Sequence, residues 1–506
     1  MSPVRSPELP ADFPWLNCDR PLSLAELRGR VVVLDFWTYC CINCLHILPD
    51  LKYLETKYAD SLTVIGVHSA KFDNERDVDN IRQAILRHDI EHPVIVDRDF
   101  YIWQQYAVRA WPTLVIIDPL GYCIRTAAGE GNREALDEML GNLIRDYRER
   151  GKITPQTLNF NLEKRGCPLT TPLAFPGKVL ADSTQNRLFV ADSGHHRLIV
   201  GDLDGDAPQV IGTGTPGWRD GSFADAQFFA PQGMAISPDG NFLYVADTEN
   251  HAIRKIDFTT QTVETVAGTG RQSRHIYPHG GRGTEVALNS PWDLEWVENR
   301  LFVAMAGSHQ IWVLDLDGGR VETYAGRGAE SCVDGELLEA AFSQPSGLAA
   351  DGSELFVADS ESSSIRGVGL GDNPRVRTIC GSGKLLGFGE IASATLRDRE
   401  GRGFDVRLQH CLGVEYAKHL LWVADTYNHK IKRIDPQTGD SQSILGTEAQ
   451  LAEPSGLSAI GDRLYIADTN NHAIRVLKLD TFAISTVEFQ GLCAPNFCIP
   501  DRSAPP

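Results

Sequence analysis

Two cysteines separated by two residues, Cys41 and Cys44, are the side chains of this sequence best suited to covalent chemistry. They follow residues 31–36, a run rich in β-branched residues that predicts a buried strand. Leucine and isoleucine then recur at helical spacing, so we expect the dithiol on the first turn of a helix. The unpaired N–H groups and the positive dipole end of that turn favour an anion such as a thiolate. We therefore predict that Cys41 is a nucleophile and that Cys44 resolves its mixed disulfide.

A carboxylate stands inside the predicted buried strand. Asp35 lies on the strand that leads to Cys41. A carboxyl group taken out of water has a raised pKa and can accept the proton of Cys44 as that thiol attacks. The alternative is a carboxylate paired with a nearby lysine or with the backbone. We favour the first interpretation, in which Asp35 is a proton relay.

The motif around the dithiol has a known counterpart. Asp-Phe-Trp at residues 35–37, followed by the Cys-x-x-Cys of residues 41–44, is similar to the thioredoxin superfamily. Trp-Pro-Thr at residues 111–113 looks like the cis-proline loop of that fold. The resemblance implies that Pro112 lies beside the sulfur atoms and orients an extended substrate peptide. The expected neighbours of the site are Trp37, Tyr39, Cys40 and Trp111.

The dithiol motif also departs from the usual pattern of the superfamily. Cys40 stands where a tryptophan is usual, and we expect it to pack rather than to form an alternative disulfide. Ile-Asn at residues 42–43 replaces the usual Gly-Pro or Pro-Pro pair, so the direction of the redox reaction does not follow from the sequence. A zinc site would need about four ligands. Because this part of the chain has no second Cys-x-x-Cys or histidine pair, we expect neither a metal nor a cofactor.

Strands and helices alternate over residues 15–150. The expected strands are 31–36, 62–67, 93–96, 114–117 and 121–127, and the expected helices after the dithiol helix are 77–88, 101–106 and 134–147. This alternation, ending in a hairpin, predicts an α/β thioredoxin-like three-layer sandwich. Residues 1–14 are proline-rich and are expected to form a flexible arm, and residues 151–166 are expected to form a linker.

The second half of the chain is repetitive. A five-residue motif of the type Leu-Phe-Val-Ala-Asp recurs six times, and its fifth residues are Asp192, Asp247, Met305, Asp359, Asp425 and Asp468. Each unit has room for about four short strands, so residues 167–492 are predicted to form an all-β six-bladed β-propeller. Two ring closures are open: residues 484–489 form the outer strand of the last blade, or residues 158–162 add an outer strand. Residues 493–506 would form a C-terminal tail.

The repeats carry a second resemblance. Residues 247–254 and 468–475 resemble the NHL repeat, and their combination with the dithiol unit resembles the NHL repeat-containing protein 2 family. The resemblance implies a thioredoxin-like domain fused to an NHL propeller. Because the chain stops soon after its last repeat, it implies a bacterial-type relative lacking the C-terminal β domain of the animal members.

Four of the repeated units also place a histidine four residues after the aspartate. These are His196, His251, His429 and His472, whereas the fourth copy has Ser363 at this position. Aspartate and histidine are metal ligands, and six-bladed hydrolase propellers hold calcium in their channel. Because these residues recur at equivalent positions of nearly every blade, we predict structural hydrogen bonds between turns instead.

Composition limits the possible partners and the compartment. The 506-residue chain has a formal net charge of −19, which argues against nonspecific binding to nucleic acids or anionic membranes. The N-terminus has no apolar run typical of a secretory signal, and no stretch approaches the ~18 apolar residues of a transmembrane helix. Most of the 11 cysteines are scattered singly, which favours a reducing, cytoplasmic location. Cys493 and Cys498 lie close together and are expected to be free thiols.

The function expected from these features is thiol–disulfide exchange at the Cys41-Ile-Asn-Cys44 centre, coupled to protein binding by the propeller. The partner or disulfide substrate would be a protein, bound through the propeller and the dithiol face. One alternative is a non-catalytic interaction scaffold with a vestigial redox domain. A third hypothesis is a calcium-dependent propeller hydrolase.

Overall fold

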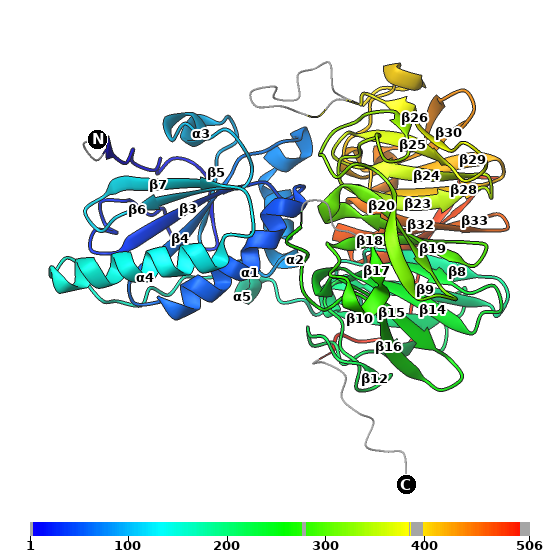
Figure 1. Ribbon diagram of the computed structural model, residues 1–506, viewed down its shortest axis with the longest axis horizontal. Helices are drawn as coiled ribbons and strands as arrows, with labels where there is room; N and C mark the ends of the chain where they lie inside the picture. The colour runs from blue at the N-terminus through cyan, green and yellow to red at the C-terminus, as the bar shows by residue number, and fades with distance from the viewer. Residues whose placement is uncertain (1–3, 276–279, 384, 386–397, 496–506) are drawn as a thin grey trace, which may run out of the picture. The chain divides into compact units, whose positions relative to one another are not determined.

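A computed structural model describes residues 4–275, 280–383, 385 and 398–495 of the chain. The chain divides into two compact units, of which the first ends at Pro168 and the second begins at Leu169 (Figure 1). None of the helices that these described ranges contain combines the length and the apolar character needed to span a membrane.

A seven-stranded sheet forms the centre of the first unit, with the strand order β1-β7-β6-β3-β4-β5-β2. Its strands are β1 (Val4–Arg5), β2 (Trp15–Leu16), β3 (Val31–Trp37), β4 (Leu62–His68), β5 (Val94–Val96), β6 (Thr113–Ile117) and β7 (Tyr122–Ala128). The central strand β3 pairs in parallel with β4 and antiparallel with β6. All of its residues are buried, as the apolar run predicted.

Helices cover both faces of this sheet (Figure 1). They are α1 (Ile42–Lys57), α2 (Val78–Arg87), α3 (Tyr101–Gln105), α4 (Arg133–Glu149) and the short α5 (Glu163–Gly166), with a 3-10 turn η1 (Asp73–Arg76) before α2. On one face, Leu51 of α1 and Leu140 of α4 pack with Val33 of β3. On the other face, Trp103 of α3 belongs to the same core as Phe36. The predicted three-layer sandwich is therefore confirmed.

Two segments expected to be loose pack against the first unit. β1 pairs with the edge strand β7, and Leu9 is a core residue. The flexible arm expected over residues 1–14 is therefore wrong for its described part, residues 4–14. The linker expected over residues 151–166 also runs along this unit. The Thr154 N–H donates to the Gly29 carbonyl at 2.9 Å, and Leu158 packs against the core.

Six antiparallel sheets make up the second unit and confirm the predicted six-bladed propeller. The first three blades contain β8 (Val179–Asp182), β9 (Arg187–Asp192), β10 (Arg197–Gly201) and β11 (Gln209–Ile211); β13 (Pro231–Ile236), β14 (Phe242–Asp247), β15 (Ala252–Asp257) and β16 (Thr262–Ala267); and β18 (Pro291–Val297), β19 (Arg300–Met305), β20 (Gln310–Asp315) and β21 (Arg320–Ala325). The last three contain β23 (Pro345–Ala350), β24 (Glu354–Asp359), β25 (Ser364–Gly369) and β26 (Arg375–Gly381); β28 (Gly413–Ala417), β29 (Leu420–Asp425), β30 (Lys430–Ile434) and β31 (Asp440–Leu445); and β32 (Pro454–Ile460), β33 (Arg463–Asp468), β34 (Ala473–Lys478) and β35 (Ile484–Val487).

Short elements complete the blades. Two-residue strands from the connections between blades extend the outer edges of four sheets: β12 (Gly221–Ser222), β17 (Gly281–Arg282), β22 (Gly335–Glu336) and β27 (Gly401–Arg402). The described 3-10 turns of this unit are η2 (Ser193–His195), η3 (Thr248–Asn250), η4 (Gly283–Glu285), η5 (Ala306–Ser308), η7 (Gly403–Asp405), η8 (Thr426–Asn428), η9 (Thr447–Ala449) and η10 (Thr469–Asn471). Beyond the last blade, Cys493 is disulfide-bonded. The expected free thiol is therefore wrong for this residue, whereas Cys498 lies outside the described residues.

The repeated histidine ties each blade to the next. Its ring Nδ1, or the serine hydroxyl in the fourth blade, accepts a hydrogen bond from a backbone N–H at the start of the following blade. The donor and acceptor residues are Ala230 and His196 (3.2 Å), Ser290 and His251 (3.0 Å), Gln344 and His309 (3.1 Å), His410 and Ser363 (3.2 Å), Glu453 and His429 (3.0 Å), and Phe175 and His472 (3.0 Å). The predicted hydrogen bonds between turns are therefore confirmed for the histidines.

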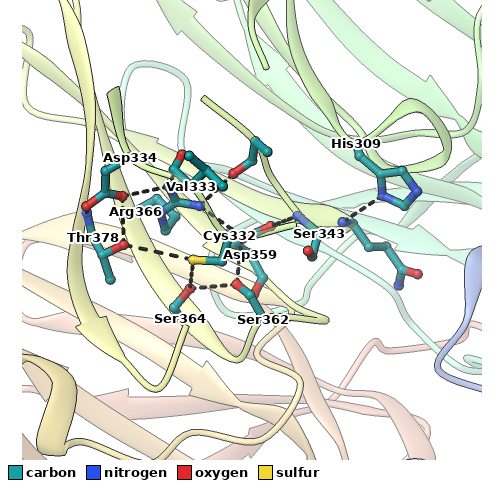
Figure 2. Close-up of polar contacts among 12 residues, drawn as sticks. His309, Cys332, Val333, Asp334, Ser343, Asp359, Ser362, Ser364, Arg366 and Thr378 are labelled. Carbon is teal, nitrogen blue, oxygen red and sulfur yellow. Dashed lines mark hydrogen bonds and ion pairs between the residues drawn. The ribbon is translucent and has the colours of Figure 1, made fainter. Parts of the chain in front are cut away.

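The repeated aspartate fixes the interior of its own blade. Figure 2 shows the fourth blade, where Asp359 accepts hydrogen bonds from the Ser343 N–H at 2.6 Å and the Ser362 hydroxyl at 2.6 Å. It also forms an ion pair with the buried guanidinium of Arg366 at 3.2 Å. The same guanidinium forms a second ion pair with Asp334 at 2.8 Å. Desolvation raises the pKa of Asp359, while Arg366 opposes this shift. These contacts occupy the carboxylate and explain the repeated residue structurally.

The first and last blades meet through several polar contacts. β35 completes a four-stranded last blade from one segment, so the first of the two predicted closures is present. The second is absent, because Leu158 packs in the first unit. Across the junction, the Ala181 N–H donates to the Ser458 hydroxyl at 3.0 Å, and the Tyr465 hydroxyl donates to the Leu203 carbonyl at 2.8 Å.

Replacing His472 should test the closure of the ring. Changing His472→Ala leaves the Phe175 N–H without its acceptor, which should lower the free energy of unfolding by about 1–3 kcal/mol. His472 has a left-handed backbone with φ +54°, so His472→Asn is the better-matched variant. Asparagine tolerates this conformation and offers an amide oxygen. Urea unfolding should rank the wild type above the asparagine variant and the alanine variant last. Equal stability of all three proteins would contradict the role of this hydrogen bond.

Candidate functional site

The dithiol lies where the central strand passes into its first helix. Cys41 is the N-cap residue of α1 and has an extended backbone, with φ −85° and ψ 114°. Its carbonyl accepts hydrogen bonds from the N–H groups of Cys44 at 3.0 Å and Leu45 at 3.2 Å. The first turn carries no acidic side chain. The helix therefore begins at the dithiol, as the spacing predicted, and no carboxylate on that turn opposes a thiolate.

The two sulfur-bearing residues differ in exposure. Cys41 is 8% exposed, whereas Cys44 is fully buried. Burial, a side-chain hydrogen bond with Cys41 and the charge of Cys41 raise the pKa of Cys44 well above its usual value. Cys44 is therefore held as a thiol against its partner. This arrangement suits a pair in which the more exposed sulfur attacks first and the buried sulfur follows.

Asp35 is the buried carboxyl group next to this pair. Neither of its side-chain oxygens has a hydrogen-bond partner among the described residues. Burial raises its pKa to about 7, while the charge of His92 opposes the shift and that of Glu55 adds to it. The alternative of a carboxylate paired with a lysine or the backbone is therefore wrong. The charge of Asp35 also raises the pKa of Cys44, so the two groups are electrostatically linked.

The shifted carboxyl makes the stability of the first unit depend on pH. The pKa of Asp35 is about 7 when folded and 3.8 when unperturbed. Between these values only the folded state holds the proton, so stability falls as the pH rises. In the wild type this loss of unfolding free energy amounts to roughly 4 kcal/mol once Asp35 is fully ionised. The Asp35→Asn variant has no carboxyl group at this position and does not show the loss. The gain over wild type, measured by urea unfolding, should therefore be larger at pH 8.5 than at pH 4. A gain that does not change with pH would contradict the shifted carboxyl.

The proline loop lies at the same edge of the sheet as the dithiol. Strand β6 pairs with β3, and Pro112 immediately precedes β6 at the end of β3 that leads to the cysteines. The Trp111–Pro112 peptide bond is cis. The indole N–H of Trp111 donates to the Ser69 carbonyl at 3.1 Å, and the Ser69 N–H donates to the Trp37 carbonyl at 3.0 Å. The loop is thereby tied to the end of the central strand.

The remaining expected neighbours pack inside the unit. Trp37 and Tyr39 both contact the His68 ring, edge-on at 5.0 Å and stacked at 5.5 Å between centroids. Cys40 is buried, and its sulfur lies 3.7 Å from the Thr38 hydroxyl oxygen. Cys40 therefore packs in the interior of the unit.

Glu75 holds the dithiol loop and was not expected from the sequence. Its fully buried carboxylate accepts hydrogen bonds from the Thr38 hydroxyl at 2.7 Å and the Cys40 N–H at 3.0 Å. The same carboxylate accepts from the N–H groups of Lys71 at 2.8 Å and Phe72 at 2.9 Å. It therefore joins the loop before α1 to the segment after β4. No motif marks Glu75, because three of these four donors are main-chain N–H groups that any residue except proline supplies.

Comparison with known proteins relates both units to established families. A thioredoxin-like family matches residues 29–123, and the NHL repeat family matches residues 230–256. "Thiol-disulfide oxidoreductase YkuV" of Bacillus subtilis (strain 168) is 25% identical over 139 residues, covering 27% of this chain and 93% of that protein. "Protein SUPPRESSOR OF QUENCHING 1, chloroplastic" of Arabidopsis thaliana is 44% identical over 518 residues. That match covers 97% of this chain but only 48% of the Arabidopsis protein, so the chain spans about half the length of this relative.

A further relative is similar along both units. "NHL repeat-containing protein 2" of Bos taurus is 43% identical over 526 residues, which cover 95% of this chain and 71% of the bovine protein. The match includes the dithiol unit and the propeller in the same order. The chain therefore belongs to the NHL repeat-containing protein 2 family.

Proposed function

We propose that this protein is a thiol–disulfide oxidoreductase whose Cys41 and Cys44 cycle between a dithiol and a disulfide. The observation that carries the proposal is the buried thiol of Cys44, hydrogen-bonded to Cys41 at the start of α1. The carboxyl of Asp35, with a pKa of about 7, supplies a group that takes up and releases protons near neutral pH. The name of the Bacillus subtilis relative of this unit supports the same chemistry.

In the reducing direction the reaction has two exchange steps. The Cys41 thiolate attacks a substrate disulfide, so a Cys41–substrate disulfide forms and the first substrate sulfur leaves as a thiolate. Asp35 then accepts the proton of Cys44 as Cys44 attacks the sulfur of Cys41. The Cys41–Cys44 disulfide forms and the second substrate sulfur leaves. Two electrons pass to the substrate, and an external dithiol must reduce the protein again. Pro112 would hold an extended substrate segment next to the sulfurs.

We assign protein binding to the propeller. The repeated aspartates and histidines of its blades are engaged in structural hydrogen bonds, which leaves the blade surfaces for recognition. The net charge of −19 favours a protein partner over nucleic acid or an anionic membrane. Nine cysteines among the described residues form no disulfide, against one, Cys493, that does. This balance favours a reducing compartment, and we propose the cytoplasm.

A trapping experiment tests the proposal. Changing Cys44→Ser removes the resolving thiol, so mixed disulfides with substrate proteins should accumulate on Cys41. Adding Cys41→Ser to this variant should empty the trap, whereas adding Cys40→Ser should leave it intact. Non-reducing gels and mass spectrometry identify the attached proteins and the cysteine that holds them. An empty trap with Cys44→Ser would refute the oxidoreductase and favour the non-catalytic scaffold.

A further inference from the structure

Polar atoms without partners gather beside Asp35. Among the described residues, neither oxygen of Asp35, nor the indole nitrogen of Trp37, nor Nε2 of His92 has a hydrogen-bond partner. Gly66 on β4 pairs with Asp35 on β3. A Cβ atom on Gly66 would lie 2.9 Å from the Trp37 nitrogen and 3.3 Å from His92 Nε2. Both nitrogens therefore point to the place over Gly66 where a side chain is missing, next to the buried carboxyl.

His92 links this place to the protein surface. Its Nε2 faces the space over Gly66, and its Nδ1 lies 3.3 Å from a carboxylate oxygen of Glu55 on α1. The side chain of His92 is 3% exposed and that of Glu55 is 24% exposed. The two ring nitrogens of one imidazole thus connect a fully buried carboxyl with a carboxylate that reaches water. A neutral imidazole accepts a proton on one nitrogen and releases one from the other.

The charges around His92 suit a group that gains and loses a proton. Burial disfavours its charged form, yet Glu55, Asp35 and Glu91 together raise the pKa of His92. Glu91 is itself paired with Lys52 at 3.4 Å and with Lys164.

His68 on β4 is another buried imidazole of this unit, and neither of its ring nitrogens has a hydrogen-bond partner among the residues described. Burial lowers the pKa of His68 to about 3, so it stays neutral at physiological pH. His92 is therefore the imidazole suited to carry charge here.

We propose that His92 and Glu55 are positioning residues that pass the proton of Asp35 to solvent during disulfide exchange. This inference rests on the proposed oxidoreductase function. As Cys44 attacks the mixed disulfide, its proton moves to Asp35. Asp35 then gives a proton to Nε2 of His92 through a water molecule held in the space over Gly66. Nδ1 of His92 gives its own proton to Glu55, from which it passes to water. Substrate leaves as a thiolate, so the proton balance is complete without another donor, and no electrons pass through this route.

A stopped-flow experiment separates the proposed proton transfer, which accompanies resolution by Cys44, from the first attack by Cys41. Reduced protein is mixed with a chromogenic aromatic disulfide. The first release of coloured thiolate reports attack by Cys41, and the second reports resolution by Cys44. In Glu55→Gln and His92→Gln the second phase should slow by about tenfold near neutral pH, because the proton of Asp35 leaves more slowly. Its pH dependence should change as well, whereas Glu55→Asp should restore much of the rate.

The control variant is Asp50→Asn, which removes another carboxylate from α1 that is not part of this chain of groups. Both of its phases should match the wild type. If the second phase and its pH dependence are unchanged in Glu55→Gln and His92→Gln, the relay is refuted and the oxidoreductase stands. If the wild type shows no first phase, the oxidoreductase itself fails and the relay falls with it. Because Glu55 lies at the surface, its variant should fold even where His92→Gln does not.

Discussion

Replacing Cys41 with serine should lower the rate of disulfide reduction by at least about a thousandfold, because the attacking nucleophile is lost. A serine hydroxyl is not ionised at neutral pH at this position and forms no disulfide with the substrate. The buried Cys44 cannot take over the first step, since its burial still holds it as a thiol in this variant. The rate is measured with an insulin-type protein disulfide and an external dithiol as reductant.

Cys40→Ser is the matched control for that experiment. It also exchanges one sulfur for one oxygen, at the preceding residue, where the thiol is buried and lies 3.7 Å from the Thr38 hydroxyl. Because Cys40 has no part in the proposed exchange, this variant should keep most of the wild-type rate. Loss of activity in Cys40→Ser together with full activity in Cys41→Ser would assign the attacking sulfur to Cys40 instead.

The second large effect should be on the stability of the propeller. In the second blade Asp247 and Arg254 are both fully buried and paired at 2.7 Å. Changing Asp247→Ala removes the buried partner of a guanidinium that cannot lose its charge. Breaking a buried pair in this way should cost about 3–5 kcal/mol. The loss is measured by urea unfolding, monitored through a spectroscopic signal that reports on the propeller. A change in unfolding free energy smaller than the error of the method would contradict the structural role of the repeated aspartate.

The third blade shows which residues can replace the Asp247–Arg254 pair of the second blade. It has Met305 in place of the aspartate and Trp312 in place of the arginine, both fully buried. The indole of Trp312 donates to Gln310 at 3.0 Å, so an apolar pair fills the same place without a buried charge. The double variant Asp247→Met, Arg254→Trp should therefore recover at least about half of the stability lost in Asp247→Ala. A double variant that is less stable than the single one would show that the blades are not interchangeable here.

The sequence predicted the architecture well because the repeats carry it. The motif ending in Asp247 recurs at the same place in each blade. The glycine and histidine residues around it mark the turns between the strands. The sequence alone does not decide the ring closure, since residues 158–162 and 484–489 both have the character of an outer strand. The choice depends on contacts far apart in the sequence, such as Ala181 with Ser458, that no local pattern contains. For the same reason the proline-rich start predicts a flexible arm, although Leu9 belongs to the core.

The candidate site was predictable only where residue types cluster in the sequence. The dithiol and Asp35 stand on one strand and the helix after it, so their proximity follows from the chain itself. Glu75 and His92 reach the site from later segments, through main-chain hydrogen bonds and through the missing side chain of Gly66. Neither signal is visible in a single sequence, because both depend on which segments the fold brings together.

The most direct test of the dithiol chemistry is the redox equilibrium of the protein itself. The purified 506-residue chain is equilibrated with dithiothreitol buffers of graded potential and quenched, and its cysteines are mapped by mass spectrometry. We expect a Cys41–Cys44 disulfide in the first unit that forms and disappears over a single two-electron transition while Cys40 stays reduced. Cys41 and Cys44 that remain thiols even in fully oxidised buffer, or a disulfide that joins either of them to Cys40, would contradict this expectation.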